Sequence, residues 1–361
     1  MRNIDSLNGF RAVSVFMVIG SHLALSGTAP DTLSQGLSLL DGTLGVRVFF
    51  CISGFLITLL LLDERKQNET ISLKQFYARR IIRIVPVNYV FIFVLFLLTQ
   101  LTQLTITQCQ FLTSITYTKN YACGSWVDGH LWSLSVEEQF YLIWPVIIAR
   151  LTAKSSVKVA LVAILLAPVS RAIEYKTGHR AFFWLTSNAD ALMIGSIAAI
   201  AVAYHFDEFI KRINYRASLL RIVSVLSIAA PIVLSRYLLL GWFTVTLGPT
   251  MQALGATYLI CSYAFHKRGA FYAALNSRVM TFFGVLSYSL YIWQEPFFTN
   301  PAFYGLQNNI ILQWPFNVVG LFLTALLSYY LLEKPLLSLR RALHPTGGNA
   351  SSFSWSGGRH D

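Results

Sequence analysis

Long apolar runs place the strongest constraint on the fold of this chain. A run of about 20 apolar residues is long enough for a helix to cross a bilayer, at about 1.5 Å per residue. Only 12% of the 361 residues are charged, against about 25% in soluble domains. The sequence therefore predicts an all-α, polytopic membrane helix bundle. About ten transmembrane helices are expected, near residues 8–27, 44–62, 84–103, 131–149, 157–173, 188–205, 218–236, 243–265, 279–298 and 313–332.

The charges between these runs predict an orientation. With the N-terminus placed in the cytoplasm, inner segments contain 22 of the 28 Lys and Arg residues and outer segments contain six. This bias is the positive-inside pattern, and it explains the net charge of +12 without nucleic acid. Both termini are therefore expected in the cytoplasm. A signal peptide cleaved near Ser26 is the alternative, which the thin positive segment before it disfavours.

The chain is expected to form one membrane domain followed by a short tail. Residues 1–345 contain all the apolar runs. Residues 346–361, TGGNASSFSWSGGRHD, are rich in Gly and Ser and are interpreted as a disordered cytoplasmic tail.

The first apolar run carries two ionisable side chains, Arg11 and His22. Eleven positions at about 100° each bring both to nearly the same helix face, separated by about 16 Å along the axis. An ionisable group costs about 2.5 kcal/mol or more at the bilayer centre, so such groups are usually functional or face a polar interior. A snorkelling Arg11 and a hydrogen-bonded core His22 are the structural alternative.

Two adjacent carboxylates, Glu137 and Glu138, lie in the fourth run at a depth that matches His22 to within a helical turn. Buried carboxylates are expensive unless they are paired. Adjacent helical residues point about 100° apart, so we expect one carboxylate to face His22 and the other to pair with Arg47 of the second run. The alternative is that both carboxylates are structural.

Three arginines, Arg79, Arg80 and Arg83, lie at the inner boundary of the third run. Their spacing predicts that they share one helical face. The planar guanidinium binds phosphate oxygens bidentately, so the cluster is a candidate site for a phosphate or pyrophosphate. A positive anchor that touches lipid phosphates is the alternative interpretation.

Other polar or small residues receive structural interpretations. Ser53 and Gly54 predict close helix packing, because small residues let two backbones approach. Asn188 or Asp190 is expected to cap the sixth run, and Glu333 is interpreted as an ordinary helix end. All five lie within or at the ends of apolar runs.

The segment at 104–130 is expected to be an outer loop that contains Cys109 and Cys123. In an oxidising compartment these two cysteines can form a disulfide, and two free thiols are the alternative. The four cysteines of the chain show no metal-ligand spacing, so no metal site is expected.

The polar residues thus fall into two groups. The ninth run adds Tyr288, Tyr291, Gln294 and Glu295 in its outer half, where tyrosines are commonly membrane-interface residues. The outer half of the bundle collects His22, Arg47, Glu137, Glu138, Asp190 and Gln294. The inner end collects Arg11, Arg79, Arg80 and Arg83. A base at one end and an anion site at the other indicate that a small group passes from a phosphorylated donor to another molecule.

Several stretches together resemble the acyltransferase-3 family, integral-membrane O-acyltransferases that acetylate bacterial surface sugars and some secondary metabolites. Besides the Arg11–His22 pair, they are GVRVFFCISGFLIT at 45–58, FYARRIIRIVP at 76–86, HLWSLSVEEQFYLIWP at 130–145, NADALMIG at 188–195, SYSLYIWQEP at 287–296 and LEKP at 332–335. Two positions depart from the family pattern, which usually has an acidic residue at Arg47 and often a histidine at Gln294.

The resemblance implies an O-acyltransferase of the bacterial inner membrane that uses acetyl-CoA and no metal. The donor phosphates would bind Arg11, Arg79, Arg80 and Arg83. His22 would act as general base, with Glu137 holding the imidazole, and an acetyl-histidine intermediate is the competing mechanism. The expected substrate-binding residues are Arg47, Glu138, Tyr288 and Gln294.

The acceptor implied by the resemblance is a sugar hydroxyl of a lipid-linked or surface polysaccharide, such as an O-antigen (lipopolysaccharide) or exopolysaccharide unit. A lipo-oligosaccharide or a macrolide-type small molecule is an alternative acceptor. We recognise no esterase-like segment, so this chain is expected to complete the transfer itself. A transporter or lipid flippase is the non-enzymatic alternative, and the lack of an internal sequence repeat counts against it.

Overall fold

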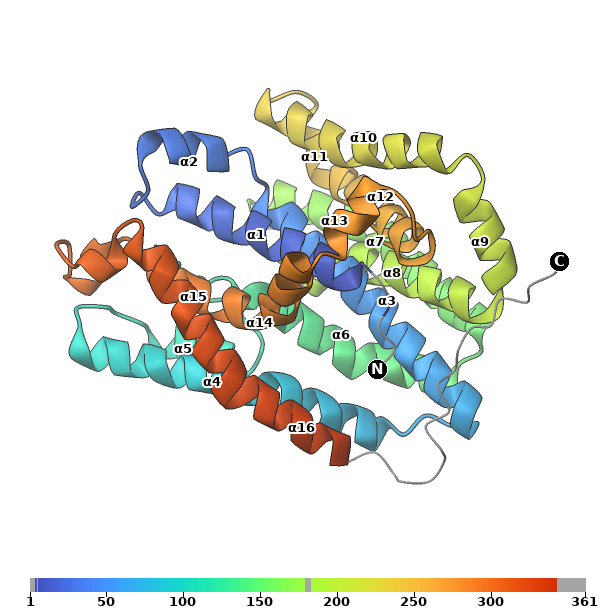
Figure 1. Cartoon of the computed structure of the whole chain (residues 1–361), viewed down its shortest axis with the longest axis horizontal. Coiled ribbons are helices and arrows are strands. Elements are labelled where there is room, and N and C mark those ends of the chain that lie inside the picture. Colours follow the sequence, from blue (N-terminus) through green and yellow to red (C-terminus); the bar gives the residue numbers. More distant parts are fainter. Residues whose placement is uncertain (1–3, 5, 179–182, 343–361) are drawn as a thin grey trace.

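Helices make up all the regular structure in the part of the chain that is described. The computed structural model describes residue 4, residues 6–178 and residues 183–342, with side chains to residue 338. Figure 1 shows the helices side by side in one bundle. The predicted all-α class is confirmed. The predicted tail at 346–361 lies outside the described residues.

Seven helical segments are long and apolar enough to cross a membrane. The last of them, Phe316–Ser338, joins α15 (Phe316–Ser328), the π-helical η3 (Tyr329–Glu333) and the start of α16 (Lys334–Ala342). The other six are α1 (Leu7–Leu25), α3 (Gly42–Asn68), α4 (Leu73–Leu101), α7 (Ala153–Lys176), α8 (Leu185–Tyr204) and α10 (Ala217–Arg236).

The three remaining runs also form long helices, although they are not among these seven. They are α6 (Leu131–Arg150), α12 (Gly248–Phe265) and α14 (Arg278–Phe298). Each of these helices carries polar side chains that face the bundle interior, such as the two glutamates of α6. These side chains lower the mean hydropathy of the helix. The count of ten spans and the cytoplasmic termini therefore stay predictions.

Short helices lie at the two ends of the bundle. Figure 1 shows α2 (Asp31–Leu37), α5 (Gln108–Ile115) and the segment before α15 toward the left, and α9 (Phe206–Asn214) at the right. We call these the outer end and the inner end, following the orientation predicted from the charges. The other short elements are α11 (Gly241–Thr246), α13 (Ala270–Leu275), η1 (Pro301–Tyr304) and η2 (Ile310–Leu312).

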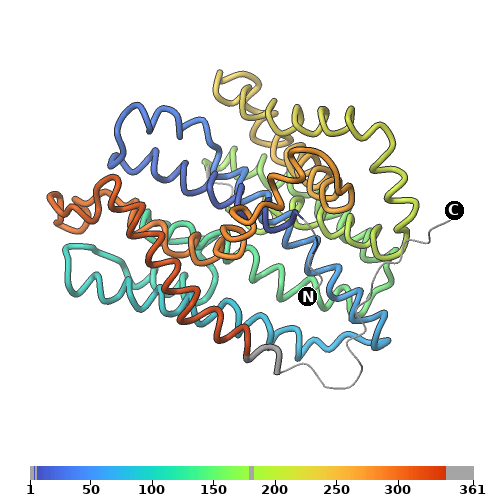
Figure 2. Tube along the Cα trace, viewed as in Figure 1, coloured from blue at the N-terminus to red at the C-terminus, as the bar shows by residue number. Residues whose placement is uncertain are grey.

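The first helix, α1, packs directly between α3 and α14 (Figure 2). Glycines allow this close approach on both sides. A Cβ atom on Gly45 of α3 would overlap the carbonyl oxygen of Ser14, and one on Gly284 of α14 would overlap that of Asn8. Small residues at such crossings let helix backbones meet. The side chains of α1 therefore face those of α14 along much of its length.

Helices α3 and α8 also meet through glycines. A Cβ atom on Gly54 would overlap the carbonyl oxygen of Leu192, and one on Gly195 would overlap that of Cys51. Ser196 Oγ donates to the carbonyl of Gly54 across the same crossing, at 3.3 Å. The packing role predicted for Gly54 is confirmed.

A buried ion pair joins α7 to α8 and corrects the interpretation of Asp190. Arg171 Nη2 lies 2.9 Å from Asp190 Oδ2, which also accepts a hydrogen bond from Thr250 Oγ1 at 2.6 Å. Arg171 donates further to the carbonyls of Ser187 and Thr246. Helix α8 begins at Leu185, so Asp190 lies too far along the helix to cap it. Its carboxylate instead neutralises a buried guanidinium.

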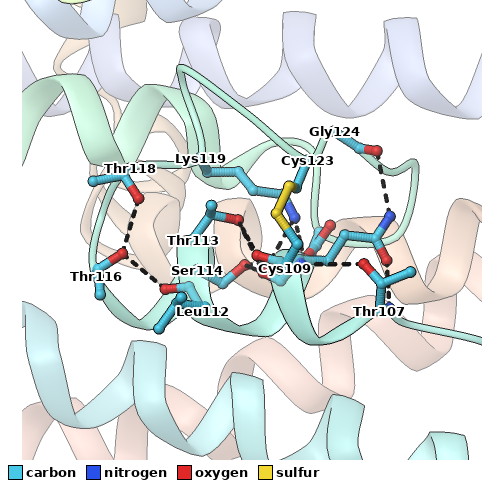
Figure 3. Close-up of a disulfide and its surroundings, with 12 residues drawn as sticks. Thr107, Cys109, Leu112, Thr113, Ser114, Thr116, Thr118, Lys119, Cys123 and Gly124 are labelled. Atoms are coloured by element: carbon cyan, nitrogen blue, oxygen red, sulfur yellow. Dashed lines mark hydrogen bonds and ion pairs between the residues drawn. A yellow bond between two sulfur atoms is a disulfide. The ribbon is translucent and has the colours of Figure 1, made fainter.

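The outer loop between α4 and α6 is cross-linked. Cys109 and Cys123 form a disulfide, so this alternative holds over two free thiols (Figure 3). Below it, Lys119 Nζ lies 2.6 Å from Asp128 Oδ2, and both side chains are 1% exposed. Ser114 Oγ donates to the same carboxylate at 2.9 Å. Burial lowers the pKa of Lys119, although Asp128 opposes this shift.

Candidate active site

A cavity of about 340 Å³ lies inside the bundle, between α1, α3, α4, α6, α14 and the η3–α16 segment. Small-molecule sites commonly have volumes of this order. We call it the arginine cavity, after Arg11, Arg80 and Arg83. Its other polar lining residues are Asn8, Ser53, Ser133, Glu137, Tyr141, Ser287, Tyr288, Tyr291, Tyr329 and Glu333.

The three arginines of the cavity have no carboxylate at ion-pair distance among the described residues. Arg11 donates to Asn8 Oδ1 at 3.3 Å. The Arg80 guanidinium lies over the ring of Tyr141, 4.8 Å from its centroid. A guanidinium without a counterion in a half-buried position has donors available for an anion. The part of the cavity that these arginines line therefore has the chemistry of a phosphate site.

Arg79 does not belong to this group, which corrects one predicted residue. Its Nη2 atom lies 2.9 Å from Glu64 Oε2, and its Nη1 donates to Gln75. Arg80 and Arg83 line the cavity, whereas Arg79 does not. One residue along a helix turns a side chain by about 100°, and this turn directs Arg79 to the neighbouring carboxylate.

Glu137 lies in the arginine cavity, and this corrects the partner expected for His22. Its carboxylate accepts hydrogen bonds from Ser53 Oγ at 2.6 Å and from Tyr141 at 3.3 Å. Glu138 Oε1 is buried without a hydrogen-bond partner among the described residues. Both glutamates are expected from the sequence at the same membrane depth as His22, but in the structure they face a different part of the interior.

Arg47 is also away from both glutamates, so its expected pairing with them is wrong. Its Nη1 atom donates to Gln252 Oε1 of α12. It lines a second cavity, of about 230 Å³, at the outer end. Arg171 and Asn188 line the same cavity.

The carboxylate beside His22 belongs to Glu295 of α14. His22 Nδ1 lies 3.3 Å from Glu295 Oε1, and Nδ1 of His130 lies 3.9 Å from the same oxygen. The His22 side chain is 22% exposed, whereas that of Glu295 is 5% exposed. Because α1 packs along α14, His22 meets the last turn of that helix. We call His22, His130, Gln294 and Glu295 the His22 centre.

Buried polar atoms without a partner gather at this centre. Among the described residues, no hydrogen bond is made by Nδ1 of His22 or of His130, by either amide atom of Gln294, or by Oε2 of Glu295. The His22–Glu295 contact is at ion-pair distance but is not aligned as a hydrogen bond. A buried polar atom left unpaired costs about 1–3 kcal/mol, so such a group calls for an explanation. A polar ligand bound at the centre provides one.

Tyr291 separates the His22 centre from the arginine cavity. Its ring lines the cavity. Its hydroxyl donates to the carbonyl of His130 at 2.9 Å and lies 2.6 Å from Ser133 Oγ. The ring centroids of Tyr291 and His130 are 5.5 Å apart. The cavity and the centre are therefore neighbouring parts of one polar interior.

Three residues of this interior carry roles that the sequence interpretation missed. Glu333 is buried, accepts a hydrogen bond from Ser289 and lines the arginine cavity, so it is not an ordinary helix end. His130 and Glu295 complete the His22 centre. Tyr288, which was expected to bind substrate, does line the cavity, and its hydroxyl donates to the carbonyl of Ile84 at 2.9 Å. The sequence signal that could have pointed to Glu295 is a charged residue inside an apolar run.

This fold and interior are those of a membrane-embedded member of an acyltransferase family. The acyltransferase-3 family, described as an acyltransferase domain, matches residues 4–333. The chain belongs to this family, and the resemblance seen in its motifs is confirmed.

Curated relatives are similar over nearly the whole chain. It is 27% identical over 367 residues to the peptidoglycan O-acetyltransferase OatA of Listeria monocytogenes, covering 92% of this chain and 56% of that protein. It is 26% identical over 364 residues to the O-acetyltransferase OatA of Staphylococcus aureus, covering 93% and 57%. It is 26% identical over 373 residues to the putative peptidoglycan O-acetyltransferase YrhL of Bacillus subtilis, covering 93% and 55%. The chain thus spans about half the length of these relatives. No solved structure gives a significant match.

Proposed function

We propose that this chain is an O-acetyltransferase of the bacterial inner membrane that moves an acetyl group from cytoplasmic acetyl-CoA to a hydroxyl of a cell-envelope sugar. The observation that carries this proposal is the arrangement of two chemistries along α1. Beside Arg11 lie two more arginines that have no carboxylate at ion-pair distance in the described part of the chain, and a histidine–carboxylate centre surrounds His22 eleven residues further on. An anion site and a base held about 16 Å apart suit a long donor with phosphates at one end and a thioester at the other.

Arg11, Arg80 and Arg83 are the proposed ligands of the donor phosphates. They come from two helices, α1 and α4, and converge on one cavity. Coenzyme A carries a pyrophosphate and a further phosphate, which fit several guanidinium groups at once. The thin pantetheine arm would extend along the cavity past Ser133 and Tyr291 toward the His22 centre. Membership of an acyltransferase family supports a thioester donor.

His22 is the proposed general base. Neutral imidazole would accept the proton of the acceptor hydroxyl while the hydroxyl oxygen attacks the thioester carbonyl. The new C–O ester bond forms, the C–S bond breaks, and the proton held by His22 passes to the departing thiolate of coenzyme A. Glu295 takes the role first given to Glu137, because its carboxylate is the one that faces Nδ1 of His22. Formation of an acetyl-histidine before transfer is the alternative order of the same bond changes.

The proposed acceptor is a hydroxyl of peptidoglycan or of another envelope polysaccharide, including its lipid-linked precursors. Support comes from the relatives, two of which carry peptidoglycan in their names. O-antigen and exopolysaccharide units belong to the same chemical class. Because the chain spans about half of those relatives, the acceptor is assigned here as a class.

Acetyl analysis of surface glycans tests this function. Cells would express the wild type, His22→Ala or His266→Ala, each confirmed in the membrane at equal amounts. His266 is a matched control, since it lies near Asn214, after α12, away from the His22 centre. Base-labile acetate with the wild type and His266→Ala, but not with His22→Ala, is expected. Equal acetate in all three strains would contradict the proposal.

A further inference from the structure

An exposed tryptophan lies beside the reactive histidine at the outer end of the bundle. The rings of Trp126 and His22 are 5.8 Å apart between centroids, with an interplanar angle of 60°. Trp126 is 40% exposed. Its indole therefore presents free surface beside the His22 centre.

The position of this indole is fixed by its surroundings. Its Nε1 atom donates to the carbonyl of Phe298, at the end of α14, at 3.3 Å. Val127 and Asp128, which follow it, are buried. Asp128 holds the segment through Lys119 and Ser114.

The disulfide shown in Figure 3 closes the same outer loop. The loop carries Trp126 between this cross-link and the start of α6. An aromatic side chain that is already ordered loses little conformational entropy when it binds a ligand. Trp126 is therefore a rigid platform.

A second observation beside His22 points to a polar ligand. Gln294 is fully buried with its side chain within reach of His22, and neither of its amide atoms makes a hydrogen bond of regular geometry among the described residues. One amide group offers a donor and an acceptor together. An aromatic face next to a convergent donor, acceptor and base is a combination that recognises a molecule with an apolar face and hydroxyl groups at its edge.

We propose that Trp126 and Gln294 form the acceptor subsite, which binds a pyranose ring. This rests on the proposed function. The C–H face of the sugar stacks on the exposed indole, and Gln294 hydrogen-bonds a ring substituent. The reacting hydroxyl then points at His22. The acceptor enters at the outer end, opposite the arginine cavity, so donor and acceptor approach the same histidine from two sides.

Kinetics of purified full-length variants test the platform. The acceptor would be glycan fragments released from cells that express His22→Ala, which lack the added acetate. For Trp126→Ala, the KM for acceptor is expected to rise roughly tenfold, because the variant loses both the stacked aromatic contact and the apolar area that the indole would bury against the sugar. The kcat and the KM for acetyl-CoA are expected to stay within about threefold. Trp126→Phe should restore most of the acceptor affinity.

Trp242→Ala is the matched control, because Trp242 is an exposed tryptophan whose ring contacts Tyr175. It should leave every constant unchanged. An unchanged acceptor KM in Trp126→Ala would overturn the proposal, and so would a fall in kcat alone, which would indicate a structural role for the indole. If the wild type itself transferred no acetate to glycan, the proposed function would fail and the subsite with it. That outcome differs from a wild type that transfers acetate and a Trp126→Ala protein that matches it.

Discussion

His22 of α1 faces Glu295 of α14, with 3.3 Å between Nδ1 and Oε1. The same carboxylate oxygen lies 3.9 Å from Nδ1 of His130. One carboxylate therefore lies between two imidazoles, at the place where α1, α14 and the start of α6 meet. If the imidazole turns so that its Nδ1–H donates to this carboxylate, the tautomer with Nε2 of His22 free to accept a proton is selected. In the proposed mechanism, Glu295 is therefore the residue that positions His22.

Glu295→Gln is expected to lower kcat for acetyl transfer by about 10²–10⁴-fold, the range for losing an effective general base. The KM for acetyl-CoA should change little, because Glu295 is not among the described residues that line the arginine cavity. Steady-state kinetics of the purified protein measure both values. Glu137→Gln is the matched control and should keep kcat within about tenfold. A larger kcat loss for Glu137→Gln than for Glu295→Gln would restore Glu137 as the partner of His22.

Arg80→Ala and Arg83→Ala are each expected to weaken acetyl-CoA binding by about 10–100-fold. A hydrogen bond to a charged group contributes about 1.5–3 kcal/mol. Calorimetry of the detergent-purified protein with coenzyme A measures this directly, without turnover. Arg79→Ala should bind coenzyme A like the wild type, because Arg79 pairs with Glu64 outside the cavity. Equal losses for all three variants would indicate a general effect of inner-end charge instead.

Gly54→Ala is expected to destabilise the bundle, because the added Cβ atom would overlap the carbonyl oxygen of Leu192. Overpacking costs about 1–3 kcal/mol where side chains can shift, and here the neighbour is backbone. A lower melting temperature in detergent is the expected readout. Gly36→Ala is the control, since a Cβ atom there meets no atom within 4 Å. If both variants had the melting temperature of the wild type, the close α3–α8 crossing would be wrong.

Asp190→Ala is expected to destabilise the protein by about 3–5 kcal/mol, the cost of leaving a buried charge unpaired. The charge concerned is Arg171, which is 1% exposed. Asp190→Asn should cost less, since its amide oxygen can still accept from Arg171 and Thr250. Chemical unfolding monitored by tryptophan fluorescence compares the two. A folded Asp190→Ala protein of wild-type stability that had lost acetyl transfer would mean that Asp190 serves the chemistry.

The sequence predicts much of the fold because long apolar runs leave few alternatives in a membrane. Each of the ten runs lies largely within a helix. The close packing at Gly54 and the gathering of Arg11, Arg80 and Arg83 at one cavity also follow from local rules of size and charge. These features depend on a residue and its near neighbours in the chain, which is information that a single sequence contains.

The pairings between helices could not be predicted in the same way. The depth of Glu137 matched that of His22, but depth leaves the rotation of a helix undetermined, and rotation decides which carboxylate meets the imidazole. Asp190 resembled a helix cap because it lies near a helix start, whereas its partner Arg171 is on another helix. Glu333 looked terminal because the apolar run ends there, yet a π-helical turn carries the segment on into α16.

The position of Tyr291, between the arginine cavity and the His22 centre, bears on whether protons can leak across the membrane. A chain of polar groups that crossed the membrane without interruption would also let protons follow the electrical gradient, at about 2.3 kcal/mol per charge for each 100 mV. The ring of Tyr291, whose hydroxyl contacts His130 and Ser133, lies between the arginine cavity and the His22 centre. In the proposed reaction, the acetyl group that passes this ring is uncharged. An acetyl transfer of the kind proposed would therefore move no net charge through the membrane potential.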